Sequence, residues 1–137
     1  MKDLFDVHCH MVPGVDDGAS DLEESLAMLK MEYRDGVRNI IVTPHYRRRM
    51  FETPAKKVHE QFQKLQEAAK KEYPDLSLYL GCELHSNMDL QEILEKRKYV
   101  TMAGSSYVLL EFSEGDTMYC PAAMNRLSRM WSAIRRR

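Results

Sequence analysis

The run Asn39-Ile40-Ile41-Val42-Thr43 constrains the fold more than any other stretch of this sequence. It is rich in β-branched residues and is bounded by Gly36 and Pro44. Such a run is typical of a strand that is buried on both faces, which is the usual situation in parallel sheets. The strand is therefore expected in a parallel sheet, with helical crossovers on either side of it in the chain.

Helical periodicity is present on both sides of this strand. Before it, apolar residues recur at helical spacing behind a capping-box sequence that begins at Ser20, so a first helix is predicted over about residues 21–35. After it, Pro54 opens a second helix that Pro74 terminates. A shorter helix is predicted from residue 89 to about 97, and another from 118 to 134.

Strand-like runs separate these helices. They are predicted at four places, over residues 4–7, 37–43, 76–80 and 107–110. Strand and helix thus alternate four times, which predicts an α/β fold with a parallel sheet and right-handed crossovers. In folds of this kind, functional residues gather at the carboxyl ends of the strands.

Composition narrows the class of protein. The chain has 137 residues, 44% hydrophobic and 30% charged, which is typical of one globular domain. The net charge of -1 gives no electrostatic case for binding nucleic acid. No apolar run reaches the ~20 residues that cross a bilayer, and the N-terminus lacks the apolar segment of a signal peptide. Three distant cysteines indicate a reducing compartment, so a cytoplasmic protein without a membrane span is expected.

Histidines and carboxylates occupy the positions where the predicted strands end. His8 and His10 alternate, so both side chains are expected on one side of the first strand, with Asp17 folding back toward them from the next loop. The ends of the next three strands carry one residue each: His45, Glu83 and Glu111. Taken singly, each could be an ordinary surface histidine or a satisfied carboxylate. Together, three imidazoles and three carboxylates suit Zn, Mn or Fe(II) and predict a two- or three-metal hydrolytic centre.

Two further features bear on catalysis. Cys9 and Cys82 adjoin candidate ligands, and each is expected in the core rather than as a nucleophile. Arg48, in the run that follows His45, is a candidate catalytic residue that would grip phosphate bidentately, and a solvated basic loop is the alternative.

Five short motifs connect these residues to a known family. They are His8-Cys9-His10, the loop from Pro13 to Gly18, Thr43-Pro44-His45, Gly81-Cys82-Glu83 and Leu110-Glu111-Phe112. In this order they resemble the PHP superfamily, and more narrowly the bacterial manganese-dependent protein tyrosine phosphatases of capsule and exopolysaccharide clusters. The resemblance extends from residue 3 to about residue 120.

The resemblance implies a distorted (β/α)7 barrel with a trinuclear metal centre, of which this chain supplies the N-terminal part, about four βα units. It implies Mn²⁺ as the cofactor, in two or three ions, with zinc, iron or cobalt as alternatives. It also implies a bridging role for Glu83, and the implied metal ligands are His8, His10, Asp17, His45, Glu83 and Glu111. The implied substrate is phosphotyrosine on a cognate bacterial tyrosine autokinase that controls polysaccharide export.

The sequence departs from this family in its second half. Family members are roughly twice as long and supply a further histidine, a catalytic arginine and an Asp-x-His pair, whereas no histidine follows His85 here. Residues 1–137 are therefore expected to form a single truncated domain with an atypical arginine-rich tail over 126–137. This tail is expected to reflect a shifted or prematurely ended reading frame, and downstream DNA without a motif-bearing frame would contradict that. The open edge of a partial barrel predicts poor solubility or an obligatory oligomer.

Two alternatives to a protein tyrosine phosphatase stay open on the sequence. One is a small-molecule phosphatase of the same superfamily, of the histidinol-phosphate type. The other is an inactive fragment that retains metal binding or kinase binding. Mn²⁺-dependent hydrolysis of an aryl phosphate would separate an enzyme from a fragment.

Overall fold

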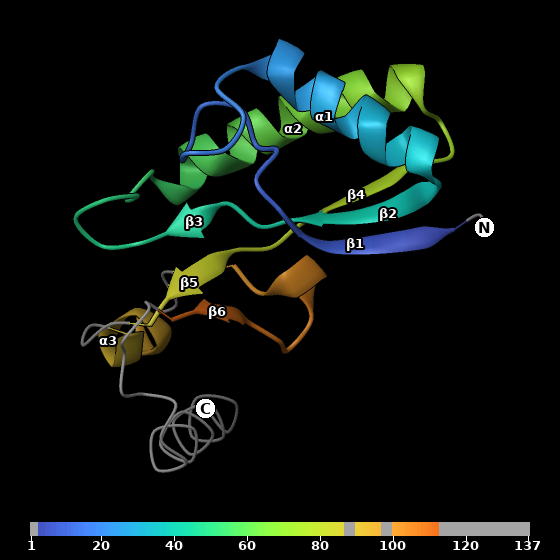
Figure 1. The fold of residues 1–137 in the computed structure, drawn as a ribbon. Coiled ribbons are helices and arrows are strands. Elements are labelled where there is room, and N and C mark those ends of the chain that lie inside the picture. Colours follow the sequence, from blue (N-terminus) through green and yellow to red (C-terminus); the bar gives the residue numbers. More distant parts are fainter. Residues whose placement is uncertain (1–2, 87–89, 97–99, 113–137) are drawn as a thin grey trace.

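The alternation of strands and helices is confirmed by a computed structural model, which describes residues 3–86, 90–96 and 100–112 (Figure 1). The predicted helix over 118–134 and the arginine-rich tail lie outside the described residues. The elements, in chain order, are β1 (Leu4–Cys9), α1 (Leu22–Asp35), β2 (Val37–Val42), β3 (His45–Tyr46), α2 (Ala55–Glu72), β4 (Ser77–Leu80), β5 (Glu83–His85), α3 (Leu90–Glu95), the 3-10 helix η1 (Met102–Gly104) and β6 (Leu109–Glu111).

The strands pair in two sheets of three strands each. The first has the order β1-β2-β4 and the second the order β3-β5-β6, and all four pairs of neighbouring strands are parallel. The prediction of an α/β fold with parallel strands is thus confirmed, but the expected single sheet is divided. The described residues do not by themselves form the closed barrel that the resemblance implies.

Two neighbouring strands, β2 and β4, are each interrupted at the same level and then continue in the second sheet. β2 continues into β3 after Thr43 and Pro44, and β4 continues into β5 after Gly81 and Cys82. Pro44 has no N–H group, so the hydrogen-bond ladder cannot run through it. Two hydrogen bonds bridge the gap, because Gly81 N–H donates to Val42 O at 2.8 Å and Glu83 N–H donates to Pro44 O at 3.1 Å. The candidate ligands His45 and Glu83 are therefore the first residues of resumed strands.

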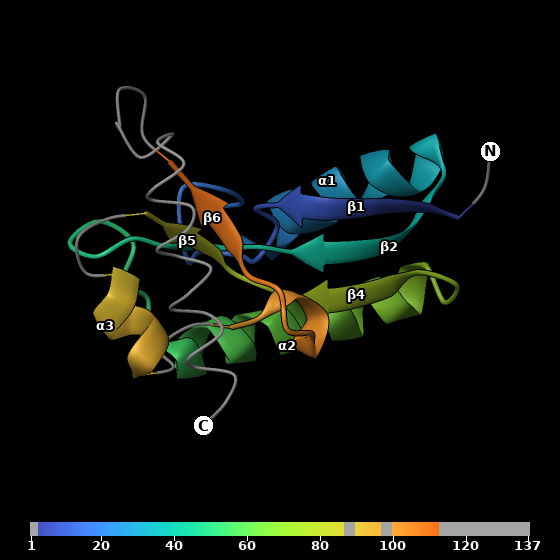
Figure 2. The same ribbon diagram turned by 90° about the horizontal axis from the view of Figure 1, so that it is seen from below.

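Helices cover one face of the first sheet. In Figures 1 and 2, α1 and α2 lie together over β1, β2 and β4. The main core forms in this layer, where Leu29 of α1, Ile40 of β2 and Leu65 of α2 are fully buried. A second, smaller cluster joins Leu84 of β5 to Ile93 of α3. None of the described helices is long and apolar enough to span a membrane.

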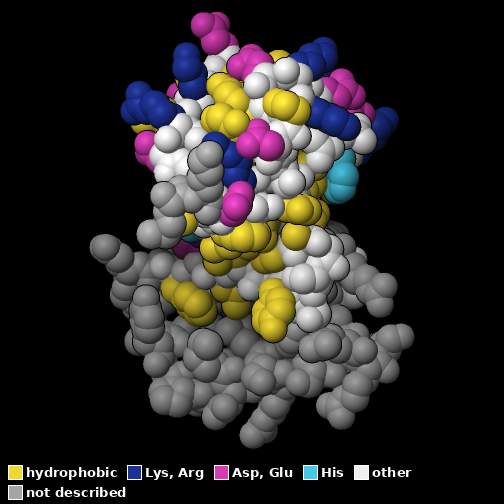
Figure 3. Space-filling view, turned by 90° about the vertical axis from the view of Figure 1, so that its right-hand side faces the viewer, with side chains coloured by type: hydrophobic (Ala, Val, Ile, Leu, Met, Phe, Trp, Pro, Cys, Tyr) yellow, Lys and Arg dark blue, Asp and Glu magenta, His cyan; other side chains and the backbone are white. Residues whose placement is uncertain are grey.

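The opposite face of the first sheet carries exposed apolar side chains. The register pairs Phe5 with Asn39 and Ile41 with Tyr79, which places these residues on the face away from buried Ile40. Phe5 is 68% exposed and Tyr79 is 43% exposed. Figure 3 shows hydrophobic side chains gathered in a band below the charged upper part of the molecule.

The start of α1 differs from the prediction by one residue. The N-cap is Asp21 rather than Ser20, and the Asp21 side chain accepts a hydrogen bond from Glu24 N–H at 2.9 Å. The side chain of Glu24 in turn accepts from Ser20 N–H at 2.8 Å. Glu24 therefore bonds back to the residue before the N-cap, whereas in a standard capping box it would bond to the N-cap residue itself. The helix ends as predicted, because Gly36 adopts the left-handed conformation with φ 101°.

Candidate metal centre

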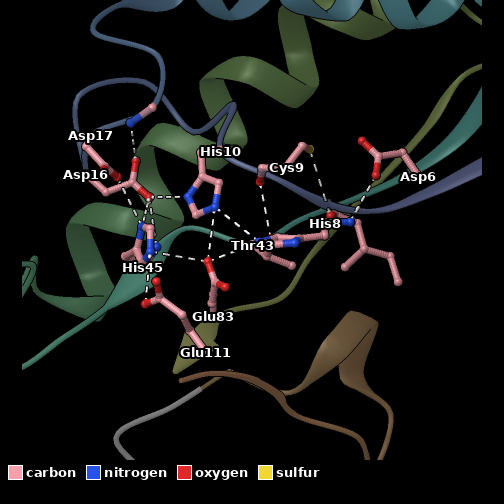
Figure 4. Close-up of polar contacts among 12 residues, drawn as sticks. Asp6, His8, Cys9, His10, Asp16, Asp17, Thr43, His45, Glu83 and Glu111 are labelled. Atoms are coloured by element: carbon pink, nitrogen blue, oxygen red, sulfur yellow. Dashed lines mark hydrogen bonds and ion pairs between the residues drawn. The ribbon is translucent and has the colours of Figure 1, made fainter. Parts of the chain in front are cut away.

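Six side chains predicted from the sequence to form a metal site converge in the structure, and Figure 4 shows how they lie. They come from the ends of strands and from one loop. His8 belongs to β1 and His10 follows it, Asp17 lies in the loop before α1, His45 begins β3, Glu83 begins β5, and Glu111 ends β6.

Glu83 lies at the centre of this group. Its Oε2 atom lies 3.0 Å from Nε2 of His8, 3.1 Å from Nε2 of His10 and 3.3 Å from Nε2 of His45. Ligand atoms held at about 2.1 Å from one ion, in tetrahedral or octahedral geometry, lie about 3.0–3.4 Å from one another. The distance from Glu83 Oε2 to each imidazole nitrogen is therefore the distance between two ligands of one ion, with His8 and His10 in one donor group and His45 in another.

His45 extends the group toward two further carboxylates. Its Nδ1 atom lies 3.1 Å from Oδ1 of Asp17, and its Nε2 atom lies 3.6 Å from Oε2 of Glu111. The ring stacks on Phe51, with 5.1 Å between the ring centroids. This stacking holds both ring nitrogens toward the carboxylates.

Two of the candidate ligand atoms lack the hydrogen bonds that buried polar atoms normally make. Nδ1 of His45 and Oε2 of Glu111 are buried and have no hydrogen-bond partner. Buried polar atoms in proteins are nearly always hydrogen-bonded, so buried ligand atoms without a hydrogen bond fit a site that binds a cation. Neutral imidazoles with carboxylates suit zinc, manganese or iron. The residues present thus fit a metal, and the candidate ligand atoms gather in three overlapping groups: His8-His10-Glu83, His45-Glu83-Glu111 and His10-Asp16-Asp17-His45.

Asp16 is the residue that the sequence prediction missed. Its side chain has no solvent exposure, and its Oδ2 atom accepts hydrogen bonds from Nδ1 of His10 and from the backbone N–H of His45, both at 2.8 Å. Oδ1 accepts from Gly18 N–H at 3.1 Å. An aspartate two residues before a glycine is a signal for a turn in which the side chain accepts from the backbone, and this signal could have found it.

The same hydrogen bonds shift two pKa values in the site. The hydrogen bond to Asp16 raises the pKa of His10, against a smaller opposing effect of burial. Burial acts to raise the pKa of Asp16, but the bonds from His10, His45 and Gly18 outweigh it and leave that pKa below its ordinary value. Both pKa shifts therefore favour an ionised Asp16 carboxylate that is hydrogen-bonded to the His10 imidazole.

Of the two described cysteines, Cys82 is buried in the core as predicted, and Cys9 is half-buried and packs against the main core cluster. Burial raises the pKa of Cys82 to about 12 and raises the pKa of Cys9 as well. A thiol in this state is a poor nucleophile, because only the thiolate reacts. The site therefore lacks a cysteine nucleophile among the described residues.

Arg48 lies on a hairpin next to the site. The backbones of Arg47 and Phe51 pair across this hairpin. Nη1 of Arg48 lies 3.3 Å from Oε2 of Glu92 on α3. Its predicted role in gripping phosphate stays a prediction.

This chain is similar to known proteins in its sequence and in its fold. The family model for capsular polysaccharide synthesis, CpsB/CapC, matches residues 4–131. Tyrosine-protein phosphatase CpsB from Streptococcus pneumoniae is 44% identical over 110 residues, covering 80% of this chain and 45% of that protein. Tyrosine-protein phosphatase YwqE from Bacillus subtilis is 32% identical over 109 residues, covering 80% of this chain and 43% of that protein.

A solved structure shares the fold. It comes from work on YwqE from Bacillus subtilis and CpsB from Streptococcus pneumoniae, described as metal-dependent tyrosine phosphatases, and it matches with a TM-score of 0.72 at 32% identity. The match covers 80% of this chain and 44% of that chain. The chain thus spans less than half the length of these relatives. Because the family model covers nearly the whole sequence, the chain belongs to the CpsB/CapC family of capsular polysaccharide synthesis.

Proposed function

We propose that this chain carries part of the active site of a metal-dependent phosphomonoester hydrolase that acts on phosphotyrosine in proteins, in capsular or exopolysaccharide synthesis. The observation that carries the proposal is the convergence of three imidazole nitrogens on Glu83 Oε2, within 3.3 Å. Relatives named as tyrosine phosphatases support the choice of substrate. The partner proposed for the protein is a cognate bacterial tyrosine autokinase.

The proposed cofactor is Mn²⁺, in two or three ions, with zinc, iron or cobalt as alternatives. When bound, such ions supply a Lewis acid and an acidified water for attack on a phosphate ester. His8 and His10 would hold one ion, His45 and Glu111 a second, and Glu83 would be shared between them because it belongs to both donor groups. Asp17, whose side chain is 61% exposed, would bind at the open side of the site.

Arg48 is proposed to bind the phosphate of the substrate. Its guanidinium group offers paired donors that match two phosphate oxygens. Because it now lies 3.3 Å from Glu92, binding would require it to exchange that carboxylate for the substrate. The side chain is 40% exposed, so such an exchange does not disturb the core.

The fold is proposed to be the N-terminal part of a distorted (β/α)7 barrel, formed by a single domain over residues 1–137 with an arginine-rich tail over 126–137. The parallel order of both sheets supports this, because a barrel of this type has only parallel strands. The structural match to 44% of a longer relative supports it as well.

The proposed activity is tested with the purified chain, Mn²⁺ and a chromogenic aryl phosphate. We expect hydrolysis that stops when a chelator is added and that is lost in His10→Ala. His59→Ala is the matched control, since His59 is an exposed residue of α2 that lies in none of the three donor groups. A folded chain that binds Mn²⁺ but hydrolyses nothing would contradict the activity and favour the inactive fragment.

A further inference from the structure

We infer that Asp16 is a positioning residue of the proposed metal centre, which orients the His10 ring and ties the start of β3 to the loop before α1. The inference rests on the metal-binding part of the proposed function. This one carboxylate joins three parts of the site: the end of β1, the loop before α1 and the more distant β3 (Figure 4).

The hydrogen bond to His10 determines which ring nitrogen faces the metal. An ionised carboxylate only accepts hydrogen bonds, so Nδ1 of His10 carries the proton that Asp16 accepts at 2.8 Å. In the neutral ring, Nε2 is then left with its lone pair. That atom lies 3.1 Å from Glu83 Oε2 and 3.3 Å from His8 Nε2, on the metal side of the ring. Metal-binding histidines commonly donate their other ring N–H to a carboxylate in this way.

The second bond positions His45. Asp16 Oδ2 accepts from the backbone N–H of His45 at 2.8 Å, and this residue is the first of β3, directly after Pro44. The backbone hydrogen-bond ladder between strands is interrupted at Pro44. The Asp16 carboxylate therefore supplies a partner for the His45 N–H at the point where the strand resumes. It thereby links His10 and His45, whose rings lie 4.4 Å apart.

Asp16 itself is poorly suited to bind the ion. Its two oxygens already accept three hydrogen bonds, and its side chain has no exposure to solvent. It approaches His10 at Nδ1, whereas Glu83 approaches the same ring at Nε2. Its neighbour Asp17 is 61% exposed and lies beside Nδ1 of His45. The adjacent aspartates therefore divide two tasks, with Asp16 orienting ligands and Asp17 acting as one.

The tautomer is read directly from the wild-type protein by ¹⁵N NMR of its histidine rings, at a pH where the His10 ring is neutral. We expect the proton on Nδ1 in the metal-free chain and a shift toward the Nε2–H form in Asp16→Asn. A wild-type spectrum with the proton on Nε2 would overturn the inference, whether or not the variant folds. No enzyme activity is needed for this measurement.

Metal titration supplies the second measurement. Free Mn²⁺ is followed by electron paramagnetic resonance in the wild type, in Asp16→Asn and in the neighbouring Asp17→Asn. For Asp16→Asn we expect an unchanged number of bound ions with an affinity about 10- to 100-fold weaker, the range seen when such outer partners are removed. Loss of one bound ion in Asp16→Asn, or an unchanged affinity, would overturn the positioning role. A wild type that binds Mn²⁺ normally without hydrolysing phosphate would refute the activity alone.

Discussion

Three ring nitrogens surround Glu83 Oε2, and the Glu83 residue is only 5% exposed. We therefore expect Glu83→Gln to weaken Mn²⁺ binding by more than about 100-fold, because loss of a shared ligand should exceed the loss of an outer partner. The measurement is a Mn²⁺ titration followed by calorimetry. Glu67→Gln, on the exposed side of α2, is the matched control. Equal affinities in the two variants would show that Glu83 is not a ligand.

The buried thiol Cys82 gives a second test at the scale of single residues. With a pKa of about 12, a fraction of only about 10⁻⁴ of this group is thiolate at pH 8. We expect iodoacetamide to leave Cys82 unmodified in the native chain and to label it after unfolding in urea. Because the pKa is raised, labelling should accelerate only as the pH rises toward that value. Mass spectrometry of the peptide reads the result, and rapid native labelling at pH 8 would contradict the burial.

The ligand residues could be predicted because each lies at a recognisable strand end. His8 and His10 are two residues apart in a strand, so their side chains point to the same side whatever the rest of the fold. Asp16 could not be separated from Asp17 in this way, because adjacent loop residues have no fixed periodicity. Which of the two turns inward depends on the hydrogen bonds from His10 and His45, and one of these comes from a distant segment.

Among the elements, the loop before α1 packs against the end of β1 at Gly18. A Cβ atom placed on Gly18 would overlap the backbone oxygen and the Cβ of His10. We expect Gly18→Ala to cost about 1–3 kcal/mol of unfolding free energy, as overpacking does, and to weaken Mn²⁺ binding because His10 is displaced. Urea unfolding and a Mn²⁺ titration measure the two effects.

The control for this variant is Gly104→Ala in η1. Nothing lies within 4 Å of a Cβ there, but φ is +71°, so the substitution costs backbone strain of about 1 kcal/mol without touching the site. It should lower stability and leave Mn²⁺ affinity unchanged. If Gly18→Ala also left the affinity unchanged, His10 would not depend on the packing of this loop.

The main helices were predicted because their periods extend over many residues, and β2 because its β-branched run is bounded by Gly36 and Pro44. β3 and β5 were missed because they have two and three residues, too few to show any alternation. They form through pairing between distant segments, as between His45 and Glu83, after the interruption at Pro44. Similarly, Ser20 and Asp21 are both good N-caps, and local sequence could not decide between them.

At the scale of the whole molecule, one face of the first sheet carries exposed apolar residues. Phe5 is 68% exposed and Val7 is 54% exposed, both on β1. Apolar surface of this kind favours association, so we expect the chain to associate in a concentration-dependent way. Phe5→Ser should reduce that association in sedimentation velocity, whereas Met31→Ser, at an exposed position of α1, should not. Sedimentation of the wild type as a monomer at all concentrations, with sharply cooperative unfolding, would contradict this.

The class of fold followed from the order of strands and helices, whereas the division into two sheets did not. That division depends on where Pro44 and Gly81 come to lie side by side in space. The metal centre is a property of the same whole-molecule arrangement, since its ligands come from both sheets and from the loop between β1 and α1.

Anomalous X-ray diffraction from crystals of the chain grown with Mn²⁺ tests this centre most directly. We predict anomalous peaks about 2.0–2.3 Å from Glu83 Oε2, with the Nε2 atoms of His8, His10 and His45 completing the contacts. An ordered site with these side chains in place and no anomalous peak among them, or Mn²⁺ bound only elsewhere, would contradict the metal centre.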